Sequence, residues 1–114
     1  MLGKDVLENE TLYEMHVSLM KHFMDVIVLA KLRKSGSLSG YDILGFIHAT
    51  YDILISPGTV YALLYSLERK KMVAGEWTEG RRVYSLTEKG EKTIDVVSRS
   101  KGELVRFVEN LLEI

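Results

Sequence analysis

Residues 56–71 form the stretch whose side chains have the clearest capacity for intermolecular contacts. Ser56 is a good helix N-cap, and Pro57 suits the first helical position because its missing N–H costs nothing there. An apolar stripe follows at helical spacing: Val60, Leu63, Leu64 and Leu67. The opposite face is small, hydroxylated and aromatic where a solvated helix would be rich in Glu and Lys. It holds Thr59, Ala62, Ser66 and Arg69, with Tyr61 and Tyr65 at its margins.

A short helix of this kind has the width and the hydrogen-bonding groups to enter a DNA major groove, which is about 12 Å wide. The side chains expected to approach bases are Thr59, Tyr61, Ala62 and Ser66, and Tyr65 is expected to contact the DNA. Ser56 and Arg69 are expected to hold phosphates, although Arg69 also complements the dipole at the helix C-terminus. The alternative is a core helix with an incidental polar face, on which both tyrosines are core or interface aromatics.

After residue 71 the apolar period changes from 3.6 to 2, which predicts a β-hairpin. Its strands are residues 72–78 and 81–86, joined by a two-residue turn that pairs Thr78 with Arg81 and Trp77 with Arg82. One face then holds, in register, Val73, Gly75, Trp77, Arg82, Tyr84 and Leu86.

On that face of the hairpin we expect Val73, Tyr84 and Leu86 to cover the core, and Arg82 to lie across Trp77. Arg81 and Arg82 lie at the base of a short tip, as in a wing, so we expect both to hold DNA phosphates. Solubilising charge at a hairpin end is the alternative.

Further helices are predicted around these two segments. Apolar residues recur at steps of three and four over residues 9–32, as one long helix or as two joined near Lys21 and His22. Residues 37–40 are expected to form a loop, and Ser39 caps a helix over residues 40–50. Together with the helix that begins after Ser56, it forms a helix-turn-helix pattern. Thr87 caps a last helix over residues 88–112.

The last predicted helix has a heptad seam that a small monomer would leave exposed. Its positions are Ile94, Val97, Lys101, Leu104, Val108 and Leu111. We expect the N-terminal helix, the same helix of a second subunit, or both to cover it, and a homodimer is favoured. The predicted dimerisation residues are Leu12, Met15, Leu19, Ile94, Val97, Leu104, Val108 and Leu111.

The bulk composition is that of one folded, soluble domain of 114 residues, with 46% hydrophobic and 27% charged residues. No apolar run approaches the ~18–20 residues of a membrane helix. The absence of cysteine and of a signal peptide favours a cytoplasmic location. The net charge is −1, but residues 31–92 hold ten basic and seven acidic side chains, so modest, salt-sensitive DNA binding is expected.

Catalytic and metal chemistry are not indicated. His16 and His22 are six residues apart, whereas two metal ligands on one helical face lie three or four apart. No Ser/His/Asp set and no glycine-rich phosphate loop has supporting motif context. We therefore predict no enzymatic activity, no cofactor and no metal site.

Read in order, these motifs resemble a winged helix-turn-helix, and in particular the PadR-like transcriptional regulators. The matching segments are Gly-Tyr-Asp-Ile at 40–43, Ser-Pro-Gly-Thr-Val-Tyr at 56–61, Leu64 with Leu-Glu at 67–68, and Tyr-Ser-Leu-Thr-Glu-Lys-Gly at 84–90. They lie within residues 23–90 in the family's order and spacing, a combination far more specific than any one segment.

The resemblance implies a dimeric repressor whose second and third helices and wing contact operator DNA, with the C-terminal helix dimerising. It implies that Tyr41 helps to fix the helix-turn-helix and belongs to the DNA-binding set. It also implies that Ser56, Thr59 and Tyr61 lie at the DNA-facing end of the recognition helix. A small-molecule effector is left open, since no residue here marks a pocket for one.

Three features depart from the family pattern. Lys71 stands where a glycine is usual, so the lysine must adopt a left-handed conformation at some strain, or the helix ends differently. Tyr65 and Ser66 replace a pair that is usually basic, which removes phosphate contacts. The chain also has an N-terminal extension before Phe23.

The sequence thus predicts a mostly α fold with a two-stranded β wing, a winged helix-turn-helix within a single domain, residues 1–114. Residues 9–22 are an N-terminal helical extension, 23–87 the core and 88–113 the C-terminal dimerisation helix. The predicted function is sequence-specific binding of double-stranded DNA by a homodimeric regulator, as a repressor on a palindromic operator. The alternative is a winged-helix module for protein–protein interaction or assembly without operator binding.

Overall fold

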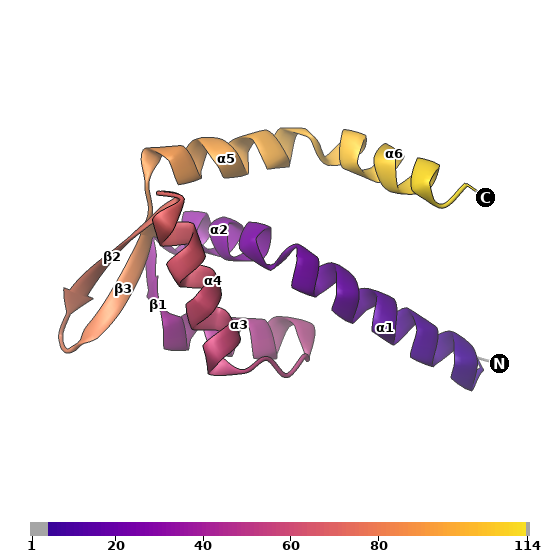
Figure 1. Cartoon of the computed structure of the whole chain (residues 1–114), viewed down its shortest axis with the longest axis horizontal. Coiled ribbons are helices and arrows are strands. Elements are labelled where there is room, and N and C mark those ends of the chain that lie inside the picture. The colour runs from indigo at the N-terminus through magenta and orange to yellow at the C-terminus, as the bar shows by residue number, and fades with distance from the viewer. Residues whose placement is uncertain (1–4, 114) are drawn as a thin grey trace.

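The computed structural model describes residues 5–113 and shows a small helical core from which two arms and a hairpin extend (Figure 1). The elements in chain order are α1 (Val6–His22), α2 (Met24–Ser35), β1 (Ser37–Ser39), α3 (Gly40–Tyr51), α4 (Pro57–Arg69), β2 (Val73–Thr78), β3 (Arg81–Leu86), α5 (Glu88–Arg99) and α6 (Lys101–Leu111). The described chain measures 52 × 28 × 21 Å. None of its helices is long and apolar enough to cross a membrane, as far as residues 5–113 are concerned.

Side-chain caps start three of the helices where the sequence predicts them. The hydroxyls of Ser39, Ser56 and Thr87 accept hydrogen bonds from the backbone N–H three residues later, at the starts of α3, α4 and α5. At α3 the carboxylate of Asp42 also accepts from the N–H of Ser39, which completes a capping box. These local contacts satisfy backbone donors that the first helical turn leaves unpaired.

Both long helical segments are broken. Phe23, with φ −103° and ψ 13°, separates α1 from α2, so the N-terminal segment is two helices and not one rod. The prediction of one helix over residues 88–112 is wrong, because Ser100 separates α5 from α6. The N–H of Ser100 bonds to the carbonyl of Val97, three residues back, which tightens the turn and interrupts the α-helical ladder.

The sheet has three antiparallel strands in the order β1-β3-β2, not the two strands predicted. The predicted hairpin register is confirmed, with Thr78 opposite Arg81 and Trp77 opposite Arg82. Residues 37–40 were expected to be a loop, but Ser37–Ser39 pairs with β3, opposite residues 83–85. The added strand supplies hydrogen-bond partners for the backbone of β3. This pairing joins segments that are distant in sequence, and a three-residue strand is too short to show a period-2 pattern.

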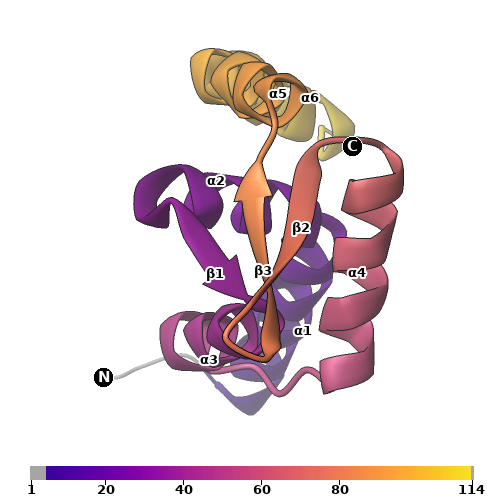
Figure 2. The same cartoon turned by 90° about the vertical axis from the view of Figure 1, so that its left-hand side faces the viewer.

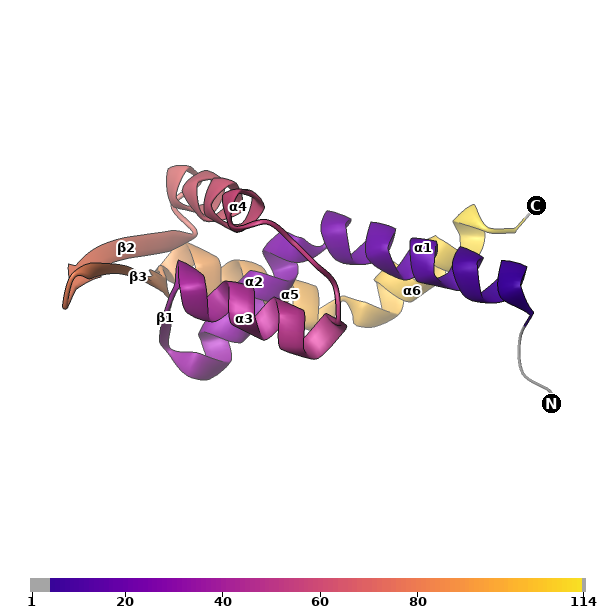
Figure 3. The same cartoon turned by 90° about the horizontal axis from the view of Figure 1, so that it is seen from below.

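The core lies between the helices and the sheet. Its fully buried side chains come from five elements and include Val28, Leu32, Ile43, Ile47, Val60, Leu64, Leu67, Val73 and Ile94. Figure 2 shows the strands in front of α1 and α2, with α4 to one side, α5 above and α3 below. Figure 3 shows the hairpin at one end of the molecule and the arms α1 and α6 at the other.

Lys71, the lysine that replaces the usual glycine, directly follows Lys70, the C-cap of α4. Its φ of 62° is left-handed, which is one of the two outcomes that the sequence leaves open. The N–H of Lys71 bonds to the carbonyl of Glu68, and the N–H of Met72 bonds to the carbonyl of Leu67. This pair of bonds is the Schellman motif, in which a residue with a Cβ is strained.

Replacing Lys71 with glycine should therefore stabilise the fold by ~0.5–1 kcal/mol, because glycine adopts this conformation without a steric penalty. Urea unfolding at fixed protein concentration measures the change. Lys70→Gly is the matched control, since Lys70 has ordinary right-handed dihedrals (φ −77°, ψ −2°) and should lose stability. Equal effects of the two changes would contradict strain at Lys71.

Candidate nucleic-acid interface

The link between α3 and α4 is held tightly and sets the angle between the two helices. Asp52 ends α3 in the left-handed conformation, with φ 53°. Ile53 and Ile55 insert into the core, while Leu54 between them is exposed. The Nε2 of His48 lies 3.3 Å from the N and 3.2 Å from the O of Ile55, so the imidazole connects α3 to the residue before the α4 cap.

A tyrosine ring on α4 packs on a glycine of α3. A Cβ at Gly40 would lie 2.3 Å from Cε1 of Tyr61, so only glycine leaves room for this ring. Tyr61 is 48% exposed, whereas Tyr41 is 76% exposed. Tyr41 was expected to help fix the helix-turn-helix, but its side chain is largely exposed, and the ring that packs between α3 and α4 is that of Tyr61.

The α4 residues predicted to contact DNA lie on two sides of the helix. Ala62, Tyr65 and Arg69 are exposed, and the Arg69 guanidinium lies 5.5 Å from the centre of the Tyr65 ring. Thr59 and Ser66 lie on a flank of the helix, together with Leu63 of the predicted apolar stripe, which is only half-buried. The Ser56 hydroxyl caps the N–H of Thr59 and lies 2.9 Å from its hydroxyl.

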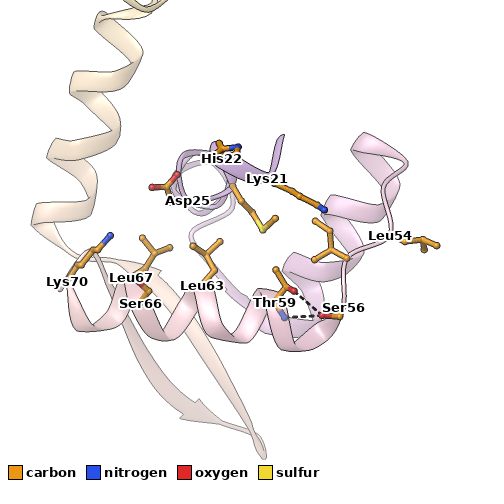
Figure 4. Close-up of a pocket in the computed structure, with 12 residues that line it drawn as sticks. Lys21, His22, Asp25, Leu54, Ser56, Thr59, Leu63, Ser66, Leu67 and Lys70 are labelled. Carbon is orange, nitrogen blue, oxygen red and sulfur yellow. Dashed lines mark hydrogen bonds between the residues drawn. The ribbon is translucent and has the colours of Figure 1, made fainter. Parts of the chain in front are cut away.

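That flank borders a hollow of about 610 Å³ between α4 and the junction of α1 and α2. Figure 4 shows Leu63 and Leu67 of α4 pointing into it, with Lys21, His22 and Asp25 on the other side. The structure therefore does not gather all the predicted base contacts on one surface. Thr59 and Ser66 border the hollow, while Tyr61, on the other flank of α4, packs on α3.

Both wing arginines are paired with acidic residues of the helix-turn-helix. The Nη2 of Arg82 lies 2.5 Å from Oε2 of Glu68 on α4, and its guanidinium lies 5.8 Å from the Tyr84 ring centre. The ring beneath Arg82 is thus Tyr84 and not Trp77, which corrects the expectation. Nη1 of Arg81 lies 3.9 Å from Oδ2 of Asp42 on α3, a looser pair. Trp77 is 72% exposed.

Hydrogen bonds shift the pKa of one carboxyl and one guanidinium at this surface. The backbone N–H of Ser39, followed by its hydroxyl, lowers the pKa of Asp42, and the nearby Arg81 charge adds to the effect. The hydrogen bond that the Arg82 guanidinium donates to the Glu68 carboxylate raises the pKa of Arg82. Asp42 and Glu68 thus partly neutralise the positive charges of Arg81 and Arg82, to which a phosphate would be attracted.

Two of the histidines, His22 and His48, make hydrogen bonds to the backbone. His22 Nδ1 lies 2.8 Å from the Ser18 carbonyl on the same helix, His48 holds the α3–α4 link, and His16 is exposed. Within residues 5–113, no group of three His, Asp or Glu side chains is placed to hold a metal ion.

Sequence reasoning missed Gly40, Asp42, His48 and Glu68 as determinants of this surface. Asp42 had a local signal, because a Ser followed three residues later by an acid is close to a capping box. Gly40 and Glu68 were noted only as parts of matching segments. Their contacts with Tyr61 and Arg82 join elements distant in sequence, so no periodic pattern reveals them.

Comparisons with known proteins agree on a family. The model of the transcriptional regulator PadR-like family matches residues 28–96. None of the curated proteins matches the chain. Among solved structures, a PadR-like transcriptional regulator from Bacillus cereus superposes with a TM-score of 0.71 at 22% identity, covering 85% of this chain and 98% of that one. A transcriptional regulator from Clostridium thermocellum gives 0.70 at 24% identity, covering 85% of this chain and 96% of that one.

A further similar structure is Bacillus subtilis PadR in complex with operator DNA. It superposes with a TM-score of 0.55 at 23% identity. The match covers 63% of this chain and 44% of that one, so the likeness concerns part of the longer protein. At these identities the superpositions show the shared fold.

The lowered pKa of Asp42 predicts a pH-dependent contribution to stability. Because the folded pKa lies below that of the unfolded chain, the ionised carboxylate stabilises the fold above ~pH 4, and this is lost as the pH falls through the folded pKa. Asp42→Asn should cost ~0.5–1 kcal/mol at pH 7, a figure limited by solvent screening of a part-exposed group. The cost should shrink towards pH 3 in urea unfolding.

Glu76→Gln is the control for that experiment. It removes one exposed carboxylate from the wing for which the described residues supply no hydrogen bond or ion pair. Its effect on the free energy of unfolding should stay small at every pH. A cost for Asp42→Asn that is the same at pH 7 and pH 3 would contradict the role given to the Asp42 charge.

Proposed function

Because the chain belongs to the PadR-like family of transcriptional regulators, we propose that it is a homodimeric repressor that binds a palindromic operator in double-stranded DNA. The observation that carries the proposal is the placement of α4 beside the hairpin. The hairpin lies at one end of the molecule with α4 beside it, and the free ends of α1 and α6 lie at the other end (Figures 1 and 3). A recognition helix and a wing need this arrangement to contact adjacent grooves of one duplex.

In the proposed complex the exposed face of α4 enters the major groove. Ala62, Tyr65 and the free edge of Tyr61 approach base edges, while Thr59 and Ser66 make contacts at the groove wall. Tyr41, which is exposed close to the Gly40–Tyr61 contact, also faces the DNA. Arg69 and Arg81 hold phosphates, assisted by Ser56 at the start of α4. We propose that it acts in the cytoplasm.

Dimerisation is proposed through the two arms. The predicted residues Leu12, Met15 and Leu19 on α1 are exposed, as are Leu104, Val108 and Leu111 on α6. No residue of α6 is buried within its own chain. Exposing apolar seams of this length to water is unfavourable, and a second copy of the chain would bury them. Ile94 and Val97 pack in or against their own core, so the shared seam begins beyond α5.

The single tryptophan offers a direct test of DNA binding. Trp77 is exposed on the wing, so its fluorescence should change when a duplex docks there. The duplex is the DNA upstream of the chain's own gene, or one enriched by the protein from a random pool, titrated against unrelated duplex. We expect tighter, salt-sensitive binding of the specific duplex, and one dimer for each palindrome.

Val108→Asp should convert the dimer to a monomer in sedimentation and lower affinity for the palindrome at least ~100-fold, because both half-sites then bind independently. Arg106→Asp places the same charge on the opposite face of α6 and should leave the dimer intact. A folded dimer that shows no salt-sensitive binding to any duplex would contradict the proposed function. It would favour the alternative, a protein–protein module with exposed aromatics on its surface.

A further inference from the structure

The contact between Arg82 and Glu68 ties the wing to the recognition helix. Arg82 projects from β3, and its guanidinium reaches the Glu68 carboxylate near the end of α4 at 2.5 Å. On the way it crosses Gly75 of β2, where a Cβ would lie 2.6 Å from the Arg82 Nε. Because Gly75 has no side chain, the Arg82 side chain has room to pass over β2. Arg82 thus joins β3 to α4 across the face of the hairpin.

The neighbouring arginine is held much more loosely. Arg81 lies 3.9 Å from Asp42 and makes no hydrogen bond to it within the described residues, and its side chain is 59% exposed against 35% for Arg82. An exposed pair at this separation contributes little and is screened by salt. Arg81 is therefore free to turn towards a phosphate, at little cost.

Arg82 is not free in this way. To reach a phosphate it would have to leave Glu68, whose side chain is only 32% exposed and lies on the helix that approaches DNA in the proposed complex. The unpaired carboxylate would then lose a charge-assisted hydrogen bond and repel the phosphate backbone. Arg82 should therefore lose more by leaving Glu68 than it gains from a phosphate contact.

We propose that Glu68 and Arg82 are a positioning pair that sets the angle between the wing and α4, and through that angle determines which duplexes fit both. Arg81, and not Arg82, is the phosphate ligand of the wing. The proposal rests on the DNA-binding function proposed above. It replaces the expectation from sequence that both arginines hold phosphates.

The test compares the affinity for a selected duplex with that for an unrelated duplex, at several salt concentrations. The ratio cancels the general gain in DNA affinity that follows from removing an acidic charge. Glu68→Ala and Arg82→Ala should each lower the ratio at least about tenfold, the cost of a misplaced base contact. Exchanging the two charges, Glu68→Arg with Arg82→Glu, should restore most of the ratio.

Arg81→Ala is the matched control. It should weaken binding to both duplexes equally, preserve their ratio and reduce the salt slope by about 0.9 for the lost phosphate contact. Melting temperatures of all variants exclude a general loss of fold. If Glu68→Ala keeps the ratio while Arg82→Ala reduces the salt slope, Arg82 is a phosphate ligand and the positioning role is wrong.

A second measurement needs no DNA. The chain has no cysteine and one tryptophan, so a dansyl group on Ala62→Cys reports the distance from α4 to Trp77 by energy transfer. Glu68→Ala and Arg82→Ala should change the transfer and the charge exchange should restore it. Unchanged transfer would overturn the positioning role, whatever the DNA result. Changed transfer in a protein that discriminates between no duplexes would instead overturn the proposed function alone.

Discussion

The fold depends most on the junction where α4 ends, β2 begins and α5 starts. The Thr87 hydroxyl donates to the Lys71 carbonyl at 2.5 Å, and the Thr87 N–H donates to the Met72 carbonyl at 3.1 Å. A Cβ on Gly90 would lie 2.1 Å from that same Met72 oxygen, so α5 can approach only because this residue is glycine. One short turn thereby fixes the direction of the C-terminal arm relative to the recognition helix. A dimer built on the arms would inherit the spacing of its two α4 helices from this junction.

Charge at the proposed DNA surface is governed by pairing and not by composition. Residues 31–92 carry a small excess of basic side chains, but both wing arginines lie beside acids of the helix-turn-helix. The two pairs differ in distance and exposure. Arg81 is held loosely by Asp42, whereas Arg82 is bound closely to Glu68 and connects the wing to α4. A near-neutral chain can in this way present a few free cations at selected places, so that the geometry of the surface contributes more to recognition than its total charge.

Features set by local chemistry could be predicted from the sequence. The caps at Ser39, Ser56 and Thr87 and the register of the hairpin each depend on residues a few positions apart. Features set by distant contacts could not. The pairing of β1 with β3, the packing of Tyr61 on Gly40 and the bond between Glu68 and Arg82 arise only when separate elements meet. The break at Ser100 was missed because the apolar seam continues across it.

The central claim is that two copies of α4 and the wing read one duplex with twofold symmetry, and hydroxyl-radical footprinting of the selected duplex tests it most directly. Two protected patches about one helical turn (~10 base pairs) apart, related by the centre of a palindrome and flanked by outer protections from the wings, are expected. A single patch without twofold symmetry, or uniform protection along the duplex, would contradict it.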